Sequence, residues 1–169
     1  MTSNEEAEGP WQRGISYKGF APGVHSFKDV EVEKIQSIQE QPVTSAIVDP
    51  QPNEEIEPDQ PFGVRGFAWS GGGRGIVRVD VSIDEGQTWH TAELTKGSEQ
   101  HPTRAWAWTF WEIELPAPAS ATGSEFNIIC KATDASYNSQ PESPQSIWNI
   151  RGLNNNSWHR VPVSVAEEE

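Results

Sequence analysis

The sequence is poor in cysteine, in positive charge and in long apolar runs. Among its 169 residues only Cys130 carries a thiol, which excludes an intrachain disulfide framework and any multi-cysteine zinc or iron–sulfur site. No apolar run approaches the roughly 18 residues that a membrane-spanning helix needs. The N-terminus also lacks the basic start and apolar stretch of a signal peptide, so we expect no association with a membrane.

Basic residues are outnumbered: 12 lysines and arginines face 25 aspartates and glutamates, which gives a formal net charge of −13. Nucleic acids and anionic membranes are bound through clustered positive charge, so neither is an expected partner. A small anionic ligand would have to be held by locally placed arginines, against the overall field of the chain.

Metal and catalytic motifs are also missing. The four histidines are scattered, and no spacing places two of them on one face; they are His25, His90, His101 and His159. No nucleophile elbow, phosphate loop or dinucleotide fingerprint occurs. Cys130 lies in an apolar alternating segment, which predicts a buried and inert thiol rather than a nucleophile or ligand.

Short strand signals dominate what is present. They fall at 43–48, 63–69, 76–83, 89–94, 106–115, 126–132, 147–150 and 158–165, with tight turns at 71–73 and 84–86. No stretch shows a sustained helical period, and no internal repeat supports a propeller. This spacing predicts an all-β sandwich of immunoglobulin-like architecture, with a small barrel as the alternative.

Three regions differ in composition. Residues 1–42 begin as an acidic tail and continue as an irregular arm rich in aromatic residues, glycine and proline. We expect this arm to lie against another surface rather than to fold alone. Residues 43–165 hold the strand signals and form the predicted domain, and residues 166–169 are a second acidic tail.

The segment 82–89 has the spacing of an Asp-box, Ser-x-Asp-x-Gly-x-Thr-Trp. Asp84 is expected to cap the turn amides, Gly86 to supply a positive φ, and Trp89 to pack beneath the turn. Such a motif is known from sialidase-like, sugar-handling proteins. A single copy without propeller repeats favours a structural hairpin.

Tryptophan is abundant, with eight residues in the chain. Alternation along one strand would place Trp106 and Trp108 on one face and Trp111 on the other. Exposed tryptophans of this kind bind partners or stack on sugar rings, whereas buried ones fill a core. We take Trp106, Trp108 and Trp111 as candidates for a protein–protein interface.

One arginine has an unusual setting. Arg151 follows the apolar segment 147–150 and precedes Gly152, at the start of a polar, asparagine-rich loop. An arginine that leaves a rigid strand beside a glycine can project away from its own backbone. Arg151 is therefore a candidate anion-binding residue.

The segments 66–74, 78–82, 86–89 and 105–111 closely resemble the molybdopterin oxidoreductase dimerisation domain, the C-terminal domain of eukaryotic sulfite oxidases and assimilatory nitrate reductases. The segments 127–132, 137–141, 148–152 and 158–161 continue the resemblance. The segments 11–13, 17–20 and 37–47 look like the end of the family's catalytic domain and its junction.

This resemblance implies an E-set (immunoglobulin-like) sandwich that forms a homodimer and contacts a catalytic molybdopterin domain. The molybdenum cofactor would belong to the parent enzyme, because the cysteine that ligates molybdenum in this family lies in the catalytic domain. The chain alone is then not expected to be catalytic. The animal-like branch implies the mitochondrial intermembrane space.

Arg151 distinguishes two branches of this family. In the sulfite-oxidising branch the arginine of the Trp-Asn-x-Arg-Gly motif reaches into the oxyanion pocket, whereas the nitrate-reducing branch usually has an apolar residue there. The resemblance therefore implies sulfite oxidation to sulfate. The alternatives are a nitrate-reductase domain or a free-standing module that binds carbohydrate or protein.

Overall fold

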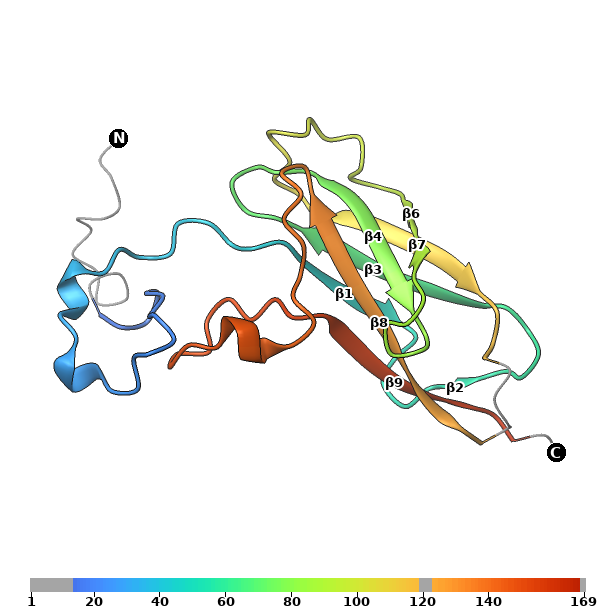
Figure 1. Ribbon diagram of the computed structural model, residues 1–169. Coiled ribbons are helices and arrows are strands. Elements are labelled where there is room, and N and C mark those ends of the chain that lie inside the picture. Colours follow the sequence, from blue (N-terminus) through green and yellow to red (C-terminus); the bar gives the residue numbers. More distant parts are fainter. Residues whose placement is uncertain (1–13, 119–122, 168–169) are drawn as a thin grey trace. The chain divides into compact units, whose positions relative to one another are not determined.

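The computed structural model describes residues 14–118 and 123–167 (Figure 1). The strands are β1 (Thr44–Asp49), β2 (Glu55–Ile56), β3 (Phe62–Trp69), β4 (Ile76–Ser82), β5 (His90–Thr91), β6 (Glu93–Leu94), β7 (Thr109–Leu115), β8 (Glu125–Asp134) and β9 (His159–Val165). Helical structure in these residues is limited to three short 3-10 turns, η2 (Phe27–Asp29), η3 (Val32–Lys34) and η4 (Pro144–Ile147). The all-β prediction is confirmed.

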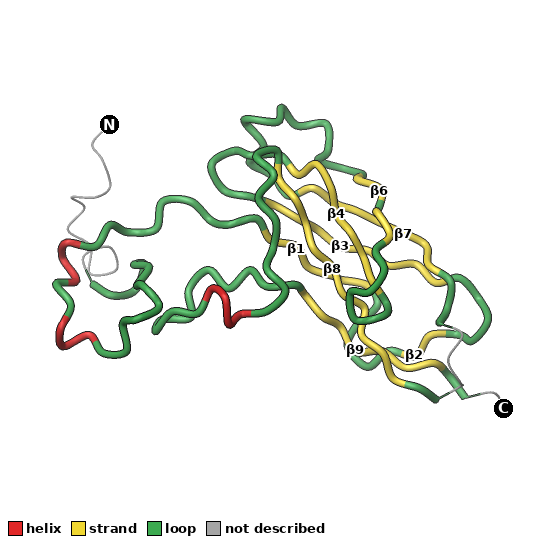
Figure 2. The backbone as a smooth tube through the Cα atoms, in the orientation of Figure 1, coloured by secondary structure: helices red, strands yellow, loops and turns green. Residues whose placement is uncertain are grey.

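The strands form two sheets that share one core (Figure 2). One sheet has the order β1-β3-β7-β6, and the other has the order β2-β9-β8-β4-β5. Alternate residues of both sheets point inward, and they include Val64, Val79, Val81, Trp111, Ile128 and Val161. Two sheets packed in this way form the predicted immunoglobulin-like sandwich rather than a barrel.

The segment predicted as one strand at 89–94 changes sheets in its middle. β5 pairs with β4 of the five-stranded sheet, whereas β6 pairs with β7 of the four-stranded sheet. Ala92 lies between them, and its N–H donates to the carbonyl of Val79 at 2.9 Å. The prediction of a single strand was wrong, because a strand at the corner of a sandwich can serve both sheets in turn.

The strand predicted at 106–115 begins only at Thr109. The side chain of Gln100 binds both backbone groups of Ala107. Gln100 Nε2 donates to the Ala107 carbonyl at 3.0 Å, and the Ala107 N–H donates to Gln100 Oε1 at 2.9 Å. A residue whose two backbone groups are bound by a side chain has nothing left for a strand partner. Trp106 and Trp108 therefore lie before the strand, not on one of its faces.

The strand predicted around 147–150 is also absent. The chain there forms η4, which begins with Pro144, and then a turn closed by the Gly152 N–H to the Asn149 carbonyl at 2.9 Å. The tight turn predicted at 71–73 does not close a hairpin, because it connects β3 of one sheet to β4 of the other. Gly72 and Gly73 have φ values of 68° and 74°, which favour glycine.

By packing, the chain divides into two compact units. One consists of residues 42–142 and 156–169 and contains both sheets; the other consists of residues 1–41 and 143–155. The segment that carries Arg151 thus groups with the arm, although by sequence it lies inside the predicted domain 43–165. Within the described ranges, no helix is long and apolar enough to cross a membrane.

Candidate functional site

Arg151 lies on a turn that is built around the side chain of Asn149. Asn149 Oδ1 accepts from the N–H groups of Arg151 and Leu153 at 3.1 and 3.3 Å, and its Nδ2 donates to the Leu153 carbonyl at 2.8 Å. Gly152 has a φ of 64°. Arg151 is exposed, and no hydrogen bond or ion pair within the described residues engages its guanidinium. The arginine therefore projects, as predicted, but from an asparagine-held turn instead of a strand.

A small cavity lies in the same segment. Its volume is about 120 Å³, and its lining consists of Pro144, Ile147, Trp148, Asn149, Gly152, Leu153 and Asn155. None of these lining residues carries a charge. An oxyanion needs charge-assisted donors when it leaves water, so this cavity does not by itself suit one.

The arm has contacts of its own. Lys18 is buried, and its Nζ donates to the carbonyl of Val32 at 2.8 Å. The rings of Phe20 and Phe27 pack edge to face with centroids 5.2 Å apart. The ring centroids of His25 and Trp148 are 5.3 Å apart, and this contact joins the arm to the 143–155 segment.

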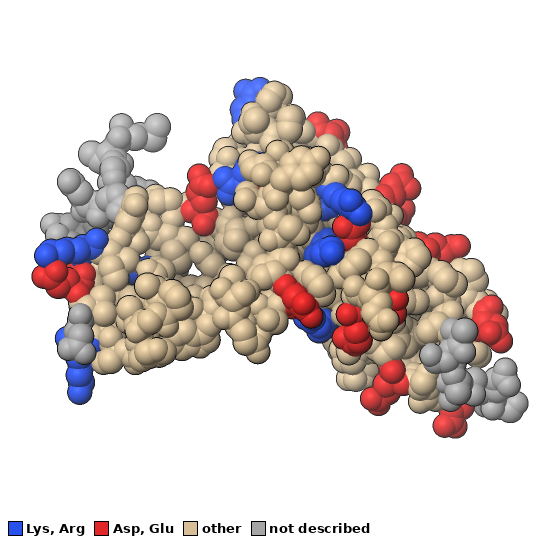
Figure 3. Space-filling view, in the orientation of Figure 1, with Lys and Arg blue, Asp and Glu red and all other residues tan. Residues whose placement is uncertain are grey.

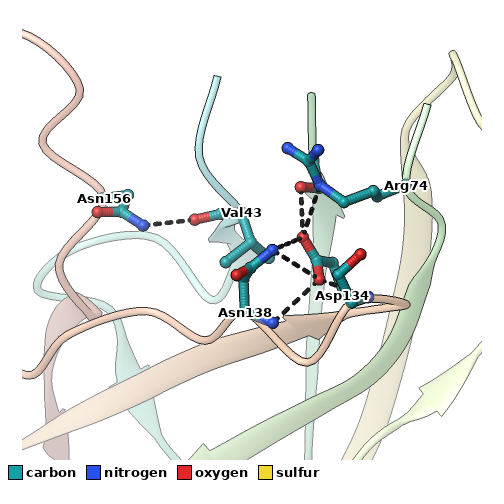
Figure 4. A network of polar contacts seen from close by, with 7 residues as sticks. Val43, Arg74, Asp134, Asn138 and Asn156 are labelled. Atoms are coloured by element: carbon teal, nitrogen blue, oxygen red, sulfur yellow. Dashed lines mark hydrogen bonds and ion pairs between the residues drawn. The ribbon is translucent and has the colours of Figure 1, made fainter. Parts of the chain in front are cut away.

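Asp134, at the end of β8, is the centre of a buried polar network (Figure 4). Its carboxylate accepts from Ser70 Oγ at 2.8 Å, from Arg74 Nε at 3.1 Å and from the backbone and side chain of Asn138. Burial alone would raise the pKa of Asp134, but these hydrogen bonds outweigh it and hold the pKa below its ordinary value. The network ties the β3–β4 connection to the end of β8.

The three tryptophans predicted as interface candidates have different surroundings. Trp106 and Trp108 are 75% and 52% exposed, whereas Trp111 is 1% exposed and belongs to the core. An indole inside the core has no surface to offer a partner, so Trp111 drops out of the interface prediction. Trp108 stacks on Phe67 with centroids 4.4 Å apart and planes inclined by 14°.

The Asp-box forms the β4–β5 hairpin as predicted. Asp84 accepts from the Thr88 N–H at 2.9 Å, from Thr88 Oγ1 at 2.7 Å and from Ser82 Oγ at 2.8 Å. These bonds lower the pKa of Asp84 from 3.8 to about 2. Gly86 has a φ of 84°, and a Cβ atom placed there would contact Trp89 and Trp158.

The tryptophan of this motif is not free for sugar stacking. Lys131 Nζ lies 3.6 Å from the centre of the Trp89 ring and 5.2 Å from that of Trp158, which packs edge-on against Trp89. Burial lowers the pKa of Lys131. The ammonium group of Lys131 covers a face of the Trp89 ring that a sugar would need, which counts against the carbohydrate alternative. More widely, Figure 3 shows basic side chains over β4 and β8, and acidic ones at the end that carries β2 and β9.

The residues that the structure describes do not fit a molybdenum site. Cys130 is fully buried on β8, burial raises the pKa of its thiol to about 12, and its nearest polar neighbour is Ser45 Oγ at 3.3 Å. A thiol that stays protonated in the core cannot ligate a metal through its thiolate. Within the described ranges, no three side chains of the ligand types His, Cys, Asp and Glu converge.

Two buried amides were missed by the sequence reasoning. Gln140 and Asn156 are 5% and 8% exposed, and they bond to each other and to the sandwich. Asn156 ends the run of three asparagines in the predicted polar loop. No local pattern distinguishes a buried asparagine from its solvated neighbours.

Comparison with known proteins identifies the family of this chain. The Mo-co oxidoreductase dimerisation domain family matches residues 35–166. This chain belongs to that family. It is 49% identical over 162 residues to the mitochondrial sulfite oxidase of Macaca fascicularis, covering 96% of this chain and 29% of the relative.

More distant members show the breadth of the family. The mitochondrial sulfite oxidase of Drosophila melanogaster is 42% identical over 98% of this chain and 29% of its own length. The NADH nitrate reductase of Solanum lycopersicum is 37% identical over 77% of this chain and 14% of its own length. The chain thus spans less than a third of the length of these relatives.

Proposed function

We propose that this chain serves as the dimerisation domain of a molybdenum-dependent sulfite oxidase, which converts sulfite to sulfate. The family match over residues 35–166 carries this proposal. Identity is higher to the sulfite oxidase of Macaca fascicularis, at 49%, than to the nitrate reductase of Solanum lycopersicum, at 37%. The cofactor would be held by a catalytic molybdopterin domain, because Cys130 is unsuited to bind it.

Arg151 would contribute one guanidinium to the oxyanion pocket of that catalytic domain. Its exposure, the turn that Asn149 builds around it and the lack of a partner for its guanidinium among the described residues support this role. A guanidinium presents a planar fork of N–H donors that matches the oxygens of sulfite and sulfate. Because the cavity near Arg151 has no charged lining, the remaining donors would come from the catalytic domain.

The homodimer would form through the outer face of the four-stranded sheet. Phe67 and Phe110 lie opposite each other in the β3–β7 register, and Phe110 is 42% exposed. Trp108 stacks on Phe67, and Trp106, two residues before Trp108 in the chain, is 75% exposed. We call Phe67, Trp106, Trp108 and Phe110 the outer aromatic patch. Exposed aromatic clusters of this kind are typical of protein–protein interfaces.

The compartment follows from the proposed enzyme. Several relatives are named mitochondrial sulfite oxidases, which supports a mitochondrial location for this protein. Within the mitochondrion, the resemblance to the animal-like branch favours the intermembrane space. Fractionation of mitochondria, followed by protease treatment with and without an intact outer membrane, would test this assignment.

The decisive experiment joins this chain to its catalytic domain and replaces Arg151 by methionine. Loss of sulfite oxidation efficiency with an intact fold would support the proposed role. The nitrate-reductase alternative predicts turnover of nitrate in the same preparation. Nitrate turnover without sulfite turnover would overturn the proposal.

A further inference from the structure

The chain leaves the sandwich after Glu142 and re-enters it at Asn156, and the intervening segment 143–155 carries Arg151. Gln140 and Asn156 stand at the two ends of this segment and are both buried in the sandwich unit. Gln140 Nε2 donates to the carbonyl of Asn156 at 2.9 Å. This hydrogen bond closes the base of the Arg151 segment.

The amide of Gln140 is engaged on both sides. Its Oε1 accepts from the Ala132 N–H at 2.8 Å and from Ser45 Oγ at 2.6 Å, while its Nε2 also donates to the Ser157 carbonyl at 3.2 Å. A backbone N–H can only donate and a carbonyl can only accept, so these partners fix which end of the amide is oxygen. A carboxylate can only accept and an apolar side chain can do neither, so neither could serve both ends.

Asn156 extends this closure to β1. Its Nδ2 donates to the carbonyl of Val43 at 2.8 Å, just before the first strand begins (Figure 4). Val43 directly follows the boundary at which the arm enters the sandwich. Trp158 adds a second closing contact, because its N–H donates to the Pro141 carbonyl at 2.9 Å and its Nε1 to the Gln140 carbonyl at 3.0 Å.

We propose that Gln140 and Asn156 are positioning residues for Arg151. They hold the two ends of the 143–155 segment together on the sandwich, so that its arginine meets the oxyanion pocket from a fixed base. The role in turnover rests on the proposed function of Arg151. The closure of the segment rests on the hydrogen bonds of Gln140, Asn156 and Trp158 and not on the role of Arg151, so it can be tested separately.

The first test measures the closure in the full chain. Gln140→Met keeps the length of the side chain but removes both sets of hydrogen bonds. The backbone N–H of Trp158 donates to the Pro141 carbonyl across the base of the segment. Its hydrogen exchange should accelerate about tenfold more than that of the β4 amides. An equal acceleration at all these amides, or none at Trp158, would overturn the closure. If Gln140→Met does not fold, Asn156→Ala tests the other part of the closure, because it removes the hydrogen bond from Nδ2 to the Val43 carbonyl and should also accelerate exchange at Trp158 more than in β4.

The second test measures turnover in the enzyme that contains the catalytic domain. Gln140→Met should raise KM for sulfite and lower kcat/KM by about tenfold, because small displacements of a substrate-binding group are costly. In a double-mutant cycle, Gln140→Met should cost little further activity once Arg151→Met is present. Ser70→Ala is the control, since it removes a buried hydrogen bond to Asp134 that lies outside the closure.

The outcomes separate the two proposals. Additive losses from Gln140→Met and Arg151→Met, or an equal loss in Ser70→Ala, would show that Gln140 is only structural and would overturn its positioning role. Full activity of Arg151→Met would overturn the proposed function, and with it the positioning role in turnover. Faster hydrogen exchange at the Trp158 amide than at the β4 amides in Gln140→Met would then still establish the closure itself.

Discussion

Gly66 of β3 lies directly opposite Trp111 of β7, and a Cβ atom on Gly66 would stand 2.3 Å from Cζ2 of the Trp111 ring. The same atom would stand 2.1 Å from the backbone carbonyl oxygen of Ala46 on β1. The large indole enters the core because the residue opposite it has no side chain.

Gly66→Ala should therefore destabilise the sandwich, because neither the backbone of β1 nor the packed indole can move freely. Overpacking of this kind costs about 1–3 kcal/mol. Urea unfolding would measure the loss. Gly63→Ala is the matched control on the same strand, since its Cβ would contact nothing within 4 Å. Equal stability of the two variants would contradict this account of Gly66.

Arg151→Met should lower kcat/KM for sulfite when the chain is joined to its catalytic domain. Methionine keeps a similar length but removes the charge and the N–H donors, and a hydrogen bond to a charged group contributes about 1.5–3 kcal/mol. This corresponds to a loss of about tenfold to a hundredfold. Steady-state kinetics with sulfite would measure it.

Arg65→Met is the control for Arg151→Met. Arg65 lies on β3 and is well exposed, and its ion pairs with Asp49 and Glu112 are long, at 3.9 and 3.7 Å. Arg78 is less suitable, because its Nε bonds to the buried carboxylate of Asp80 at 2.7 Å. An unchanged kcat/KM in Arg151→Met, or an equal loss in Arg65→Met, would mean that Arg151 has no specific role.

The outer aromatic patch predicts how the dimer forms. Trp108→Ser should shift the monomer–dimer equilibrium toward the monomer at micromolar concentration, since it removes an exposed aromatic side chain and its stacking on Phe67. Sedimentation velocity would detect the shift. Tyr137→Ser is the control, because Tyr137 is 84% exposed and lies outside the patch. A dimer unaffected by Trp108→Ser would place the interface elsewhere.

Asp84 predicts a pH dependence of stability. Its pKa is lowered from 3.8 to about 2 in the folded chain, so the folded state binds this proton less readily than the unfolded state does. The stabilising contribution is complete above pH values near 3.8 and is lost as the pH falls through about 2. Thermal unfolding across this window should depend less on pH in Asp84→Asn than in the native chain. Glu114→Gln, at an exposed position of β7, should leave the dependence unchanged.

Cys130 should resist thiol reagents in the folded protein. Burial raises the pKa of its thiol to about 12, so at neutral pH both the thiolate and access to it are lacking. Labelling with a chromogenic disulfide should be complete in denaturant and should proceed under native conditions only as fast as the protein opens. Rapid labelling of the native chain would contradict the placement of Cys130 in the core.

Much of the sandwich follows from local pattern. Alternating apolar residues predict β3, β4, β8 and β9 because side chains on a strand point to opposite faces. The Asp-box hairpin is equally local, since Asp84 and Gly86 satisfy their turn through contacts within a few residues. The projecting arginine at 151 and its family motif are likewise visible in the sequence alone.

Other features depend on contacts between residues far apart in the chain, so only the tertiary structure decides them. Alternation predicts that Trp108 and Trp111 face opposite sides, but it does not say which indole is buried; that is decided by Gly66 on the neighbouring strand, which opens a space for Trp111. Asn156 is buried because its side-chain amide reaches the Val43 carbonyl and its backbone carbonyl accepts from Gln140. Hydrogen bonds and packing across the sandwich select which polar and aromatic residues are buried, and no local periodicity records those partners.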